Sequence, residues 1–273
     1  GDIPYDESDF HNIKNILKEK SGISLSSSKK PLVYSRLSRR VRLCSFPDFR
    51  SYIAFVTSTA GSEEQSCMID ALTTNVTNFF REKHHFDHFS QIVMPDLMVR
   101  AQKGEKIRIW SSACSSGQEP FSIAMTLLNC FPKANKYDIK ILATDISFEM
   151  IDFCRRGIYS VKEAEAIPDN FINKWSKKVG NEIHFSNELK ELISFKNLNL
   201  LKPWPMQCQF VSIFCRNVAI YFDRDTQNIL WRRLSDALLP GGYLYIGHSE
   251  KINQEVVSEI TPCSCPTTYR KEK

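Results

Sequence analysis

Apolar residues in the first hundred positions recur at three- and four-residue spacing, which is typical of helices with one buried face. A first helix is predicted behind a cap at Asp6 or Ser8, and a second is opened by Pro31. A third is expected to start at Ser45-Phe46-Pro47, and a fourth to run from Glu63 to Leu72. The apolar stripes of the first three are Phe10, Ile13, Ile16 and Leu17; Val33, Leu37 and Val41; and Phe49, Ile53 and Val56. The pattern predicts a small all-α domain.

From Lys106 onward, short apolar runs alternate with helical patterns. Strands are expected at Ile107–Trp110, Ile139–Thr144, Phe210–Cys215 and Tyr243–Ile246. Pro120, Ser147 and Asp223 are expected to open the helices that follow the first three strands. Because strands that alternate with helices form a mostly parallel sheet covered on both faces, this part is predicted to be an α/β domain.

Residues 175–198 interrupt the alternation. Two apolar runs, Ile183–Phe185 and Leu192–Phe195, flank the polar pair Asn187-Glu188 and are expected to form a small antiparallel β-insert. The predicted organisation is a helical domain over residues 1–73, a linker with interdomain helices over 74–104, and an α/β domain over 105–273 that carries the insert.

Composition places the chain among ordinary globular proteins. It has 273 residues, of which 42% are apolar and 25% charged, which excludes a disordered tail, a coiled coil and a collagen-like fibre. No apolar run is long enough to span a membrane, and no signal-peptide pattern is evident. The nine cysteines form no framework, and Cys263-Ser264-Cys265 has the wrong spacing for a CxxC site, so we expect free thiols in a cytoplasmic protein and no metal. Because no exposed apolar seam is apparent, a monomer is expected.

The modest net charge of +5 conceals a local cluster of cations. Against the single acid Asp48, the stretch 29–50 contains Lys29, Lys30, Arg36, Arg39, Arg40, Arg42 and Arg50. Such a cluster fits an anionic partner, and it equally fits the solvated face of a helix.

A loop of small residues, Ala113–Gly117, follows the first strand of the α/β domain. Ligands of such sheets bind beyond the carboxyl ends of the strands. With one glycine and no lysine, the loop is neither a dinucleotide fingerprint nor a P-loop. A sulfonium cofactor fits better because it has no pyrophosphate, and Glu119 or Asp145 is suited to bind its ribose or complement its charge. Asp145 equally fits a turn or a helix cap.

Four segments carry a more specific signal. They are Leu72-Thr73-Thr74-Asn75-Val76-Thr77-Asn78-Phe79-Phe80-Arg81-Glu82, the stretch Arg108 to Pro120, Leu142-Ala143-Thr144-Asp145-Ile146, and Phe214 to Asp223 continuing to Pro240-Gly241-Gly242 and Gly247-His248-Ser249-Glu250. In order and spacing they closely resemble the CheR family of chemotaxis receptor methyltransferases. The resemblance extends from the basic N-terminal helices to Thr268-Tyr269-Arg270.

The resemblance implies a fold and a reaction. The expected fold is a small helical domain, a Rossmann-like S-adenosylmethionine methyltransferase domain and an inserted β-subdomain. The expected reaction transfers a methyl group from S-adenosylmethionine to glutamate side chains on chemoreceptor cytoplasmic helices, leaving glutamyl methyl esters and S-adenosylhomocysteine. Nucleic acid is not the expected partner, and no membrane insertion is expected.

The resemblance also implies site residues. Arg81 and Tyr221 would flank the transferred methyl group. Cofactor contacts are expected from Asn75, Thr77, Arg81, Glu119, Asp145, Asn199, Leu200, Arg216 and Asn217, and receptor contacts from Arg36, Arg39, Arg40 and Arg42.

The chemistry agrees with this set of residues. A glutamate carboxylate is already ionised at neutral pH, so its attack on a sulfonium methyl needs alignment and desolvation but no strong general base. An arginine and a tyrosine are suited to that task. His248 is expected to be structural, and His84 and His85 to pack or to cap the next helix.

Two features depart from the family pattern. Many members have Ala-Gly-Cys where this chain has Ser112-Ala113-Cys114, and an acid in place of Gln118. The short insert lacks the glycine-rich turn of members that dock on a receptor's tether peptide. The alternatives are a nucleic-acid methyltransferase, which lacks the expected Asn-Pro-Pro-aromatic motif, and a non-catalytic cofactor-binding adaptor, which the retention of Arg81 and Tyr221 disfavours.

Overall fold

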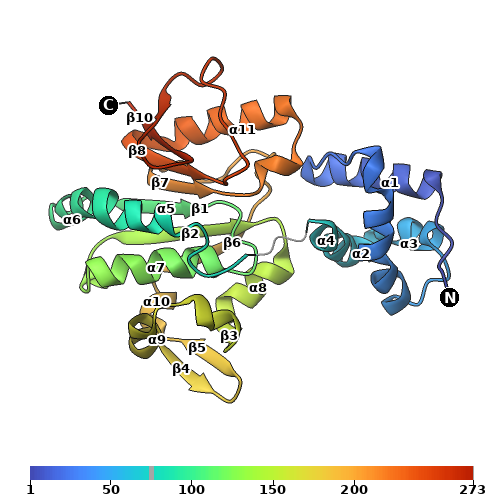
Figure 1. Ribbon diagram of the computed structural model, residues 1–273, viewed down its shortest axis with the longest axis horizontal. Coiled ribbons are helices and arrows are strands. Elements are labelled where there is room, and N and C mark those ends of the chain that lie inside the picture. Colours follow the sequence, from blue (N-terminus) through green and yellow to red (C-terminus); the bar gives the residue numbers. More distant parts are fainter. Residues whose placement is uncertain (74–76, 273) are drawn as a thin grey trace. The chain divides into compact units, whose positions relative to one another are not determined.

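The computed structural model describes residues 1–73 and 77–272, which form two compact units (Figure 1). The smaller unit comprises Gly1–Asn75 together with Ile220–Thr226, and the larger comprises Val76–Ala219 and Gln227–Lys273. Among the described residues, no helix combines the length and the apolar character that crossing a bilayer requires.

Four helices build the smaller unit. They are α1 (Glu7–Ser21), α2 (Lys30–Leu43), α3 (Phe49–Val56) and α4 (Ser62–Leu72), with short 3₁₀ turns at Ser27–Lys29 and Thr59–Gly61. The Asp6 side chain accepts from the Asp9 N–H and caps α1, as predicted. The expected start of α3 at Ser45 is wrong, because Ser45 lies in the left-handed region (φ 62°) and the capping carboxylate is that of Asp48.

The segment Ile220–Thr226 belongs to the smaller unit although it lies far along the chain. Ile23 and Phe222 form an antiparallel bridge, and the Ser24 N–H donates to the Tyr221 carbonyl at 2.7 Å. Lys18 forms an ion pair with Asp223. The backbone of Tyr221 is therefore fixed against the connection that follows α1.

A partly buried ion pair joins α2 to α4. Arg40 makes two hydrogen bonds to Glu64, which is 9% exposed, and the Tyr52 hydroxyl donates to the same carboxylate at 2.8 Å. Burial opposes ionisation of Glu64, but the bonds from Arg40 and Tyr52 outweigh it and lower the pKa of this carboxyl. Arg40 therefore stabilises the packing of this unit.

The larger unit is a seven-stranded sheet in the order β6-β2-β1-β7-β8-β10-β9. Its strands are β1 (Ile107–Ser111), β2 (Ile139–Asp145), β6 (Ile193–Asn197), β7 (Phe210–Cys215), β8 (Leu238–Ile246), β9 (Ile260–Pro262) and β10 (Thr268–Lys271). The first five are parallel, and β10 pairs antiparallel with β8 and β9. The chain order reverses between β1 and β7, so the predicted α/β fold has its switch point there.

Helices cover this sheet (Figure 1). They are α5 (Lys83–His88), a π-helical turn (Phe89–Val93), α6 (Met94–Gln102), α7 (Gln118–Cys130), α8 (Phe148–Arg156) and α11 (Arg224–Ala237). Two shorter helices, α9 (Asp169–Trp175) and α10 (Asn187–Lys190), contact α7. Ser147 caps α8 by accepting from the Met150 N–H, as predicted, and Asp223 accepts from the Thr226 N–H at the start of α11. The strands β1 and β7 are buried almost throughout, as expected for parallel strands covered on both faces.

The β-insert differs from the prediction at both of its ends. The small sheet has the order β3-β5-β4, with β3 (Ile158–Ser160), β4 (Ser176–Val179) and β5 (Glu182–Phe185), and lies beside α9 in Figure 1. The run Leu192–Phe195, expected within the insert, instead supplies β6 of the main sheet, where Ile193 pairs with Ile141. A short apolar run fits either sheet, and only its parallel partner β2 decides between them.

All nine cysteines are free thiols, as predicted. Cys114, Cys154 and Cys215 are buried and the other six are half-buried. Burial raises the pKa values of the Cys114 and Cys215 thiols well above the ordinary value for cysteine. Both thiols therefore stay protonated and unreactive.

Replacing Arg40 tests the ion pair between α2 and α4. Since the Arg40 side chain is 31% exposed, Arg40→Ala is expected to lower the free energy of unfolding by about 2 kcal/mol, less than full burial would give. Chemical unfolding followed by circular dichroism measures this. Because the pKa of Glu64 is lowered, the contribution is present above the ordinary value of 4.5 and is lost as the pH falls through the lowered pKa.

The matched control is Arg39→Ala, which removes an exposed cation from the same helix. A surface change of this kind is expected to alter stability by less than about 0.5 kcal/mol. Equal losses in the two variants would contradict a structural role specific to Arg40.

Candidate functional site

The loop after β1 is held between the ends of two neighbouring strands. The Ser112 N–H donates to the Phe214 carbonyl on β7 at 2.9 Å, and the Cys114 N–H donates to the Thr144 carbonyl on β2 at 2.8 Å. At Gly117 the backbone has φ 98°, and a Cβ there would lie 2.5 Å from the Tyr159 hydroxyl. The loop's one glycine therefore occupies the position that tolerates no side chain.

Asp145 closes the same loop from the end of β2. Its Oδ1 accepts from the Ser115 N–H at 3.0 Å and its Oδ2 from the Ser147 N–H at 3.1 Å. Burial raises the pKa of this carboxyl, and the two backbone donors partly offset the effect. Since a carboxylate oxygen accepts about two hydrogen bonds, each oxygen of Asp145 can accept one more, for example from a ribose hydroxyl. The turn role and the ligand role are thus compatible.

A buried ion pair lies at the switch point of the sheet. Arg216, directly after β7, donates from Nε to Glu119 Oε2 at 2.7 Å, and the Ser111 hydroxyl donates to Glu119 Oε1 at 2.6 Å. Arg216 also donates from Nη1 to the Arg81 carbonyl at 2.7 Å. Three residues that the sequence predicted together, Arg81, Glu119 and Arg216, are therefore linked directly.

A second buried carboxylate joins the two parts of the fourth sequence segment. Glu250 Oε1 accepts from the Asn217 N–H at 2.8 Å and from the Gly247 N–H at 2.7 Å. Asn217 is left-handed (φ 61°), and a Cβ on Gly247 would lie 2.4 Å from the Asn217 Oδ1. The Asn217 side chain donates to Glu82 at 3.4 Å. Glycine and glutamate at these positions thus shape the backbone of Asn217.

The remaining predicted cofactor contacts are spread along the larger unit. Thr77 is half-buried, Asn199 accepts from the Leu201 N–H at 2.9 Å, and Leu200 is buried after β6. Asn75 lies outside the described residues. Tyr221 belongs to the smaller unit, so its pairing with Arg81 stays a prediction.

The four arginines predicted to contact a receptor differ in their surroundings. Arg40 is bound to Glu64, and Arg36 donates to the Leu72 carbonyl at 2.8 Å. Arg39 and Arg42 are exposed, although Arg42 also donates to the Gly1 carbonyl at 3.1 Å. Of these four arginines, Arg39 and Arg42 are therefore the two whose charge is exposed.

Glu82, His84 and His85 bring three possible metal-ligand atoms within 4.8 Å of one another. Arg216 already places a cation beside them, since its Nη1 lies 3.1 Å from His85 Nδ1 and 4.0 Å from Glu82 Oε2. A divalent ion would meet this fixed positive charge at short range. The guanidinium therefore serves this carboxylate and imidazole as their cationic partner.

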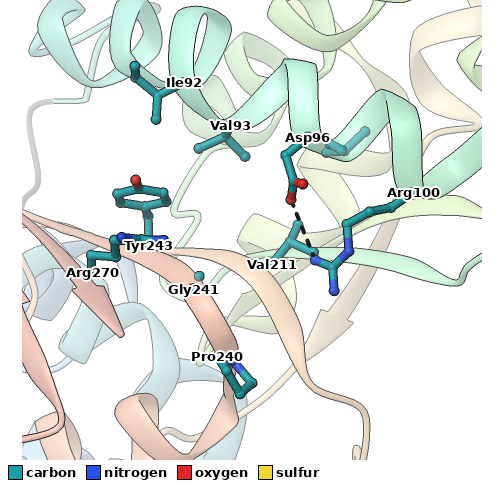
Figure 2. A pocket seen from close by; sticks show the side chains of 11 residues that line it. Ile92, Val93, Asp96, Arg100, Val211, Pro240, Gly241, Tyr243 and Arg270 are labelled. Carbon is teal, nitrogen blue, oxygen red and sulfur yellow. Dashed lines mark ion pairs between the residues drawn. The ribbon is translucent and has the colours of Figure 1, made fainter. Parts of the chain in front are cut away.

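A cavity of about 370 Å³ lies where β7 and β8 begin, at the edge opposite the loop (Figure 2). Val93 and Leu97 line it from the helical side and Tyr243 from β8. Arg100, on its rim, is paired with Asp96 at 3.9 Å and Glu105 at 2.9 Å. Because cofactors of α/β sheets bind at the carboxyl ends of the strands, this cavity is not part of the candidate site.

Sequence reasoning did not assign a site role to His85 or Glu82. His85 is fully buried and contacts Arg216, although the sequence predicted only packing or capping. One feature of the sequence could have indicated a site role for His85: it follows Arg81 by four positions, near the start of α5. The partner, Arg216, is more than a hundred positions away and gives no local pattern.

Comparisons with known proteins identify the family of the chain. Residues 8–73 match the family model described as the CheR methyltransferase all-alpha domain, and residues 75–268 match that described as the CheR methyltransferase SAM binding domain. The chain is 44% identical to a probable chemotaxis protein methyltransferase of Rhizobium etli over 254 residues, covering 92% of this chain and 94% of that protein.

Two further relatives are similar over nearly as much of their length. A chemotaxis protein methyltransferase of Borreliella burgdorferi is 39% identical over 92% of this chain and 89% of its own. Chemotaxis protein methyltransferase 2 of Pseudomonas aeruginosa is 38% identical over 90% of this chain and 87% of its own. With an all-α unit, a Rossmann-like sheet and both family domains in order, this chain belongs to the CheR methyltransferase family.

Proposed function

We propose that the protein transfers a methyl group from S-adenosylmethionine to glutamate side chains of chemoreceptor cytoplasmic helices. The observation that carries the proposal is membership of the CheR family, whose relatives are named chemotaxis protein methyltransferases. A substrate carboxylate oxygen bonds to the methyl carbon, the carbon–sulfur bond breaks with its electrons on sulfur, and the products are a methyl ester and S-adenosylhomocysteine. No proton moves, so the absence of a general base among the proposed groups fits the reaction.

The charges at the switch point fit the cofactor. Glu119 offers a carboxylate to an amino group, Arg216 offers a guanidinium to a carboxylate, and both are less than 9% exposed. Asp145 has acceptor capacity for ribose hydroxyls, and Asn75, Thr77, Asn199, Leu200 and Asn217 complete the proposed contacts. Bound S-adenosylmethionine supplies an electrophilic methyl group. Arg81 and Tyr221 are proposed to orient the substrate carboxylate toward it by charge and hydrogen bonding.

The departure at Gln118 is accommodated within the larger unit. Its side-chain oxygen accepts from the Ser116 hydroxyl at 2.6 Å and its nitrogen donates to Glu163 at 3.4 Å. An acid there would meet the Glu163 carboxylate, whereas the amide bonds to both partners. This environment favours the view that Gln118 supports the loop, against the adaptor alternative.

The reaction is tested with methyl-labelled S-adenosylmethionine and a chemoreceptor cytoplasmic fragment. Label is expected on the fragment and is expected to be released as methanol by mild base, because methyl esters hydrolyse there. A fragment whose methylation-site glutamates are replaced by alanine is the control and should stay unlabelled. Base-stable label, or label on added RNA or DNA instead, would contradict glutamyl ester formation.

Asp145→Asn tests the cofactor contacts. The change replaces an acceptor oxygen by an NH₂ group, so S-adenosylhomocysteine is expected to bind about 10- to 100-fold more weakly in calorimetry, as for loss of bonds to a charged group. Asp152→Asn is the matched control, since Asp152 is an exposed acid of α8 that pairs with the exposed Arg155 at 3.2 Å. Equal affinity in Asp145→Asn and the unchanged protein is the outcome that removes Asp145 from the proposed site.

Receptor recognition is tested by reversing the two exposed arginines together, Arg39→Glu with Arg42→Glu. The KM for the receptor fragment is expected to rise about tenfold or more at low salt, and less at high salt, because screening weakens charge steering. Cofactor affinity should not change. The control, Lys133→Glu with Lys136→Glu, alters net charge equally at exposed positions of the larger unit. Equal effects of the two pairs would show that only net charge matters.

A further inference from the structure

His85 lies between the Arg216 guanidinium and the C-terminal turn that joins β9 to β10. Its side chain is fully buried. On one side Nδ1 is 3.1 Å from Arg216 Nη1. On the other, Nε2 is 2.8 Å from the Thr267 hydroxyl and 3.3 Å from the Pro266 carbonyl. The imidazole therefore connects the turn to the ion pair of the candidate site.

These neighbours fix the proton on one ring nitrogen. The Pro266 carbonyl can only accept, so Nε2 carries the hydrogen, and the Arg216 N–H can only donate, so Nδ1 carries the lone pair. The charged and titratable groups around the ring are Arg216, Glu82, His84, His88 and Tyr245. Burial, and next the charge of Arg216, lower the pKa of His85 to about 3, so the ring is neutral at physiological pH.

Arg216 depends on this acceptor for its orientation. Its Nε bonds Glu119, and its Nη1 bonds both the Arg81 carbonyl and His85. The ring centroids of Phe86 and Phe214 lie 5.2 and 5.9 Å from the guanidinium carbon of Arg216. An aromatic face attracts the cation as a whole and does not fix the direction of a single N–H group. Glu82 Oε2 lies 4.0 Å from Nη1, beyond hydrogen-bond distance, so His85 is the side chain that accepts from Nη1 within the described part of the chain.

The C-terminal turn is held firmly enough to act as a support. Thr267 is left-handed (φ 52°), and its carbonyl accepts from the Ile246 N–H at the end of β8 at 3.0 Å. The Cys265 thiol donates to the His84 carbonyl at 3.7 Å. A non-glycine residue persists in this conformation only where its surroundings determine it. The turn is therefore anchored both to the sheet and to α5.

We infer that His85 is a positioning residue for methyl transfer: as a neutral acceptor braced by the Pro266-Thr267 turn, it holds the Arg216 guanidinium in register with Glu119 and the Arg81 backbone. The expected effect of His85 on methyl transfer rests on the proposed function. The geometry itself lies within the larger unit, which allows it to be tested without receptor.

The tautomer is tested by nitrogen-15 NMR of histidine-labelled protein. His85, assigned by the loss of its signals in His85→Gln, is expected to show a protonated Nε2 and an unprotonated Nδ1 without titrating from about pH 5 to about pH 8. Titration in that range, or a protonated Nδ1, would overturn the inference.

Variants then test the coupling to Arg216. His85→Leu is expected to weaken S-adenosylhomocysteine binding about tenfold or more, because a leucine leaves the buried Arg216 N–H without its acceptor. His85→Gln keeps an amide acceptor and donor and is expected to recover most of that affinity. In turnover, the loss should appear in the KM for S-adenosylmethionine more than in kcat.

His88→Leu is the matched control. It removes a half-buried histidine of the same helix, whose Nδ1 lies 2.7 Å from the Tyr245 hydroxyl and whose Nε2 lies 4.0 Å from the Cys263 thiol. A fall in melting temperature with nearly unchanged affinity is expected. Equal loss of affinity in His88→Leu and His85→Leu would reduce His85 to a structural role.

A second matched pair tests the brace. Thr267→Val removes the hydroxyl beside His85 while keeping a β-branched side chain at the same backbone angle, and it should weaken binding in the same direction. The control, Thr261→Val, removes an exposed hydroxyl of β9 and is expected to leave S-adenosylhomocysteine binding unchanged. If the unaltered protein binds S-adenosylhomocysteine with these variant effects but does not methylate the receptor, the proposed function fails, whereas the role of His85 in holding Arg216 for cofactor binding stands.

Discussion

The buried pair between Arg216 and Glu119 constrains much of the larger unit. Two charges removed from water are stable only if each remaining donor and acceptor has a partner. The Ser111 hydroxyl, the Arg81 carbonyl and the His85 imidazole are the partners found here, and they come from β1, the segment before α5, and α5 itself. Segments far apart in sequence are thereby brought to one point at the carboxyl ends of β1 and β7.

A second buried carboxylate explains the left-handed backbone of Asn217, the residue after Arg216. Asn217 is held left-handed by the Glu250 carboxylate, and Gly247 leaves room for the Asn217 side chain. Glu250 and Gly247 are thus needed to position a neighbouring backbone, and neither has to touch a ligand. A motif that extends over two strand ends is in this case one hydrogen-bonded unit.

In the smaller unit, neighbouring arginines of the basic stretch have two different roles: one pairs with a buried acid, and the next is exposed to solvent. Arg40 lies against the buried Glu64 carboxylate, whereas Arg39, one position earlier, is exposed. Successive helical positions point about 100° apart, so one arginine faces the core and its neighbour faces solvent. Counting cations in the sequence could not separate the charge that stabilises the fold from the charge available to a partner.

The sequence by itself determined the two kinds of architecture and most element positions, and it singled out Arg81, Glu119 and Arg216, which the structure links directly. Helix caps and buried strands such as Phe210–Cys215 are local, so periodicity and capping chemistry were sufficient to find them. Only the tertiary structure decided that Leu192–Phe195 contributes to the main sheet, that Arg40 pairs with Glu64, and that His85 supports Arg216. Each of these depends on a partner distant in sequence, and a partner's identity leaves no pattern in the local order of residues.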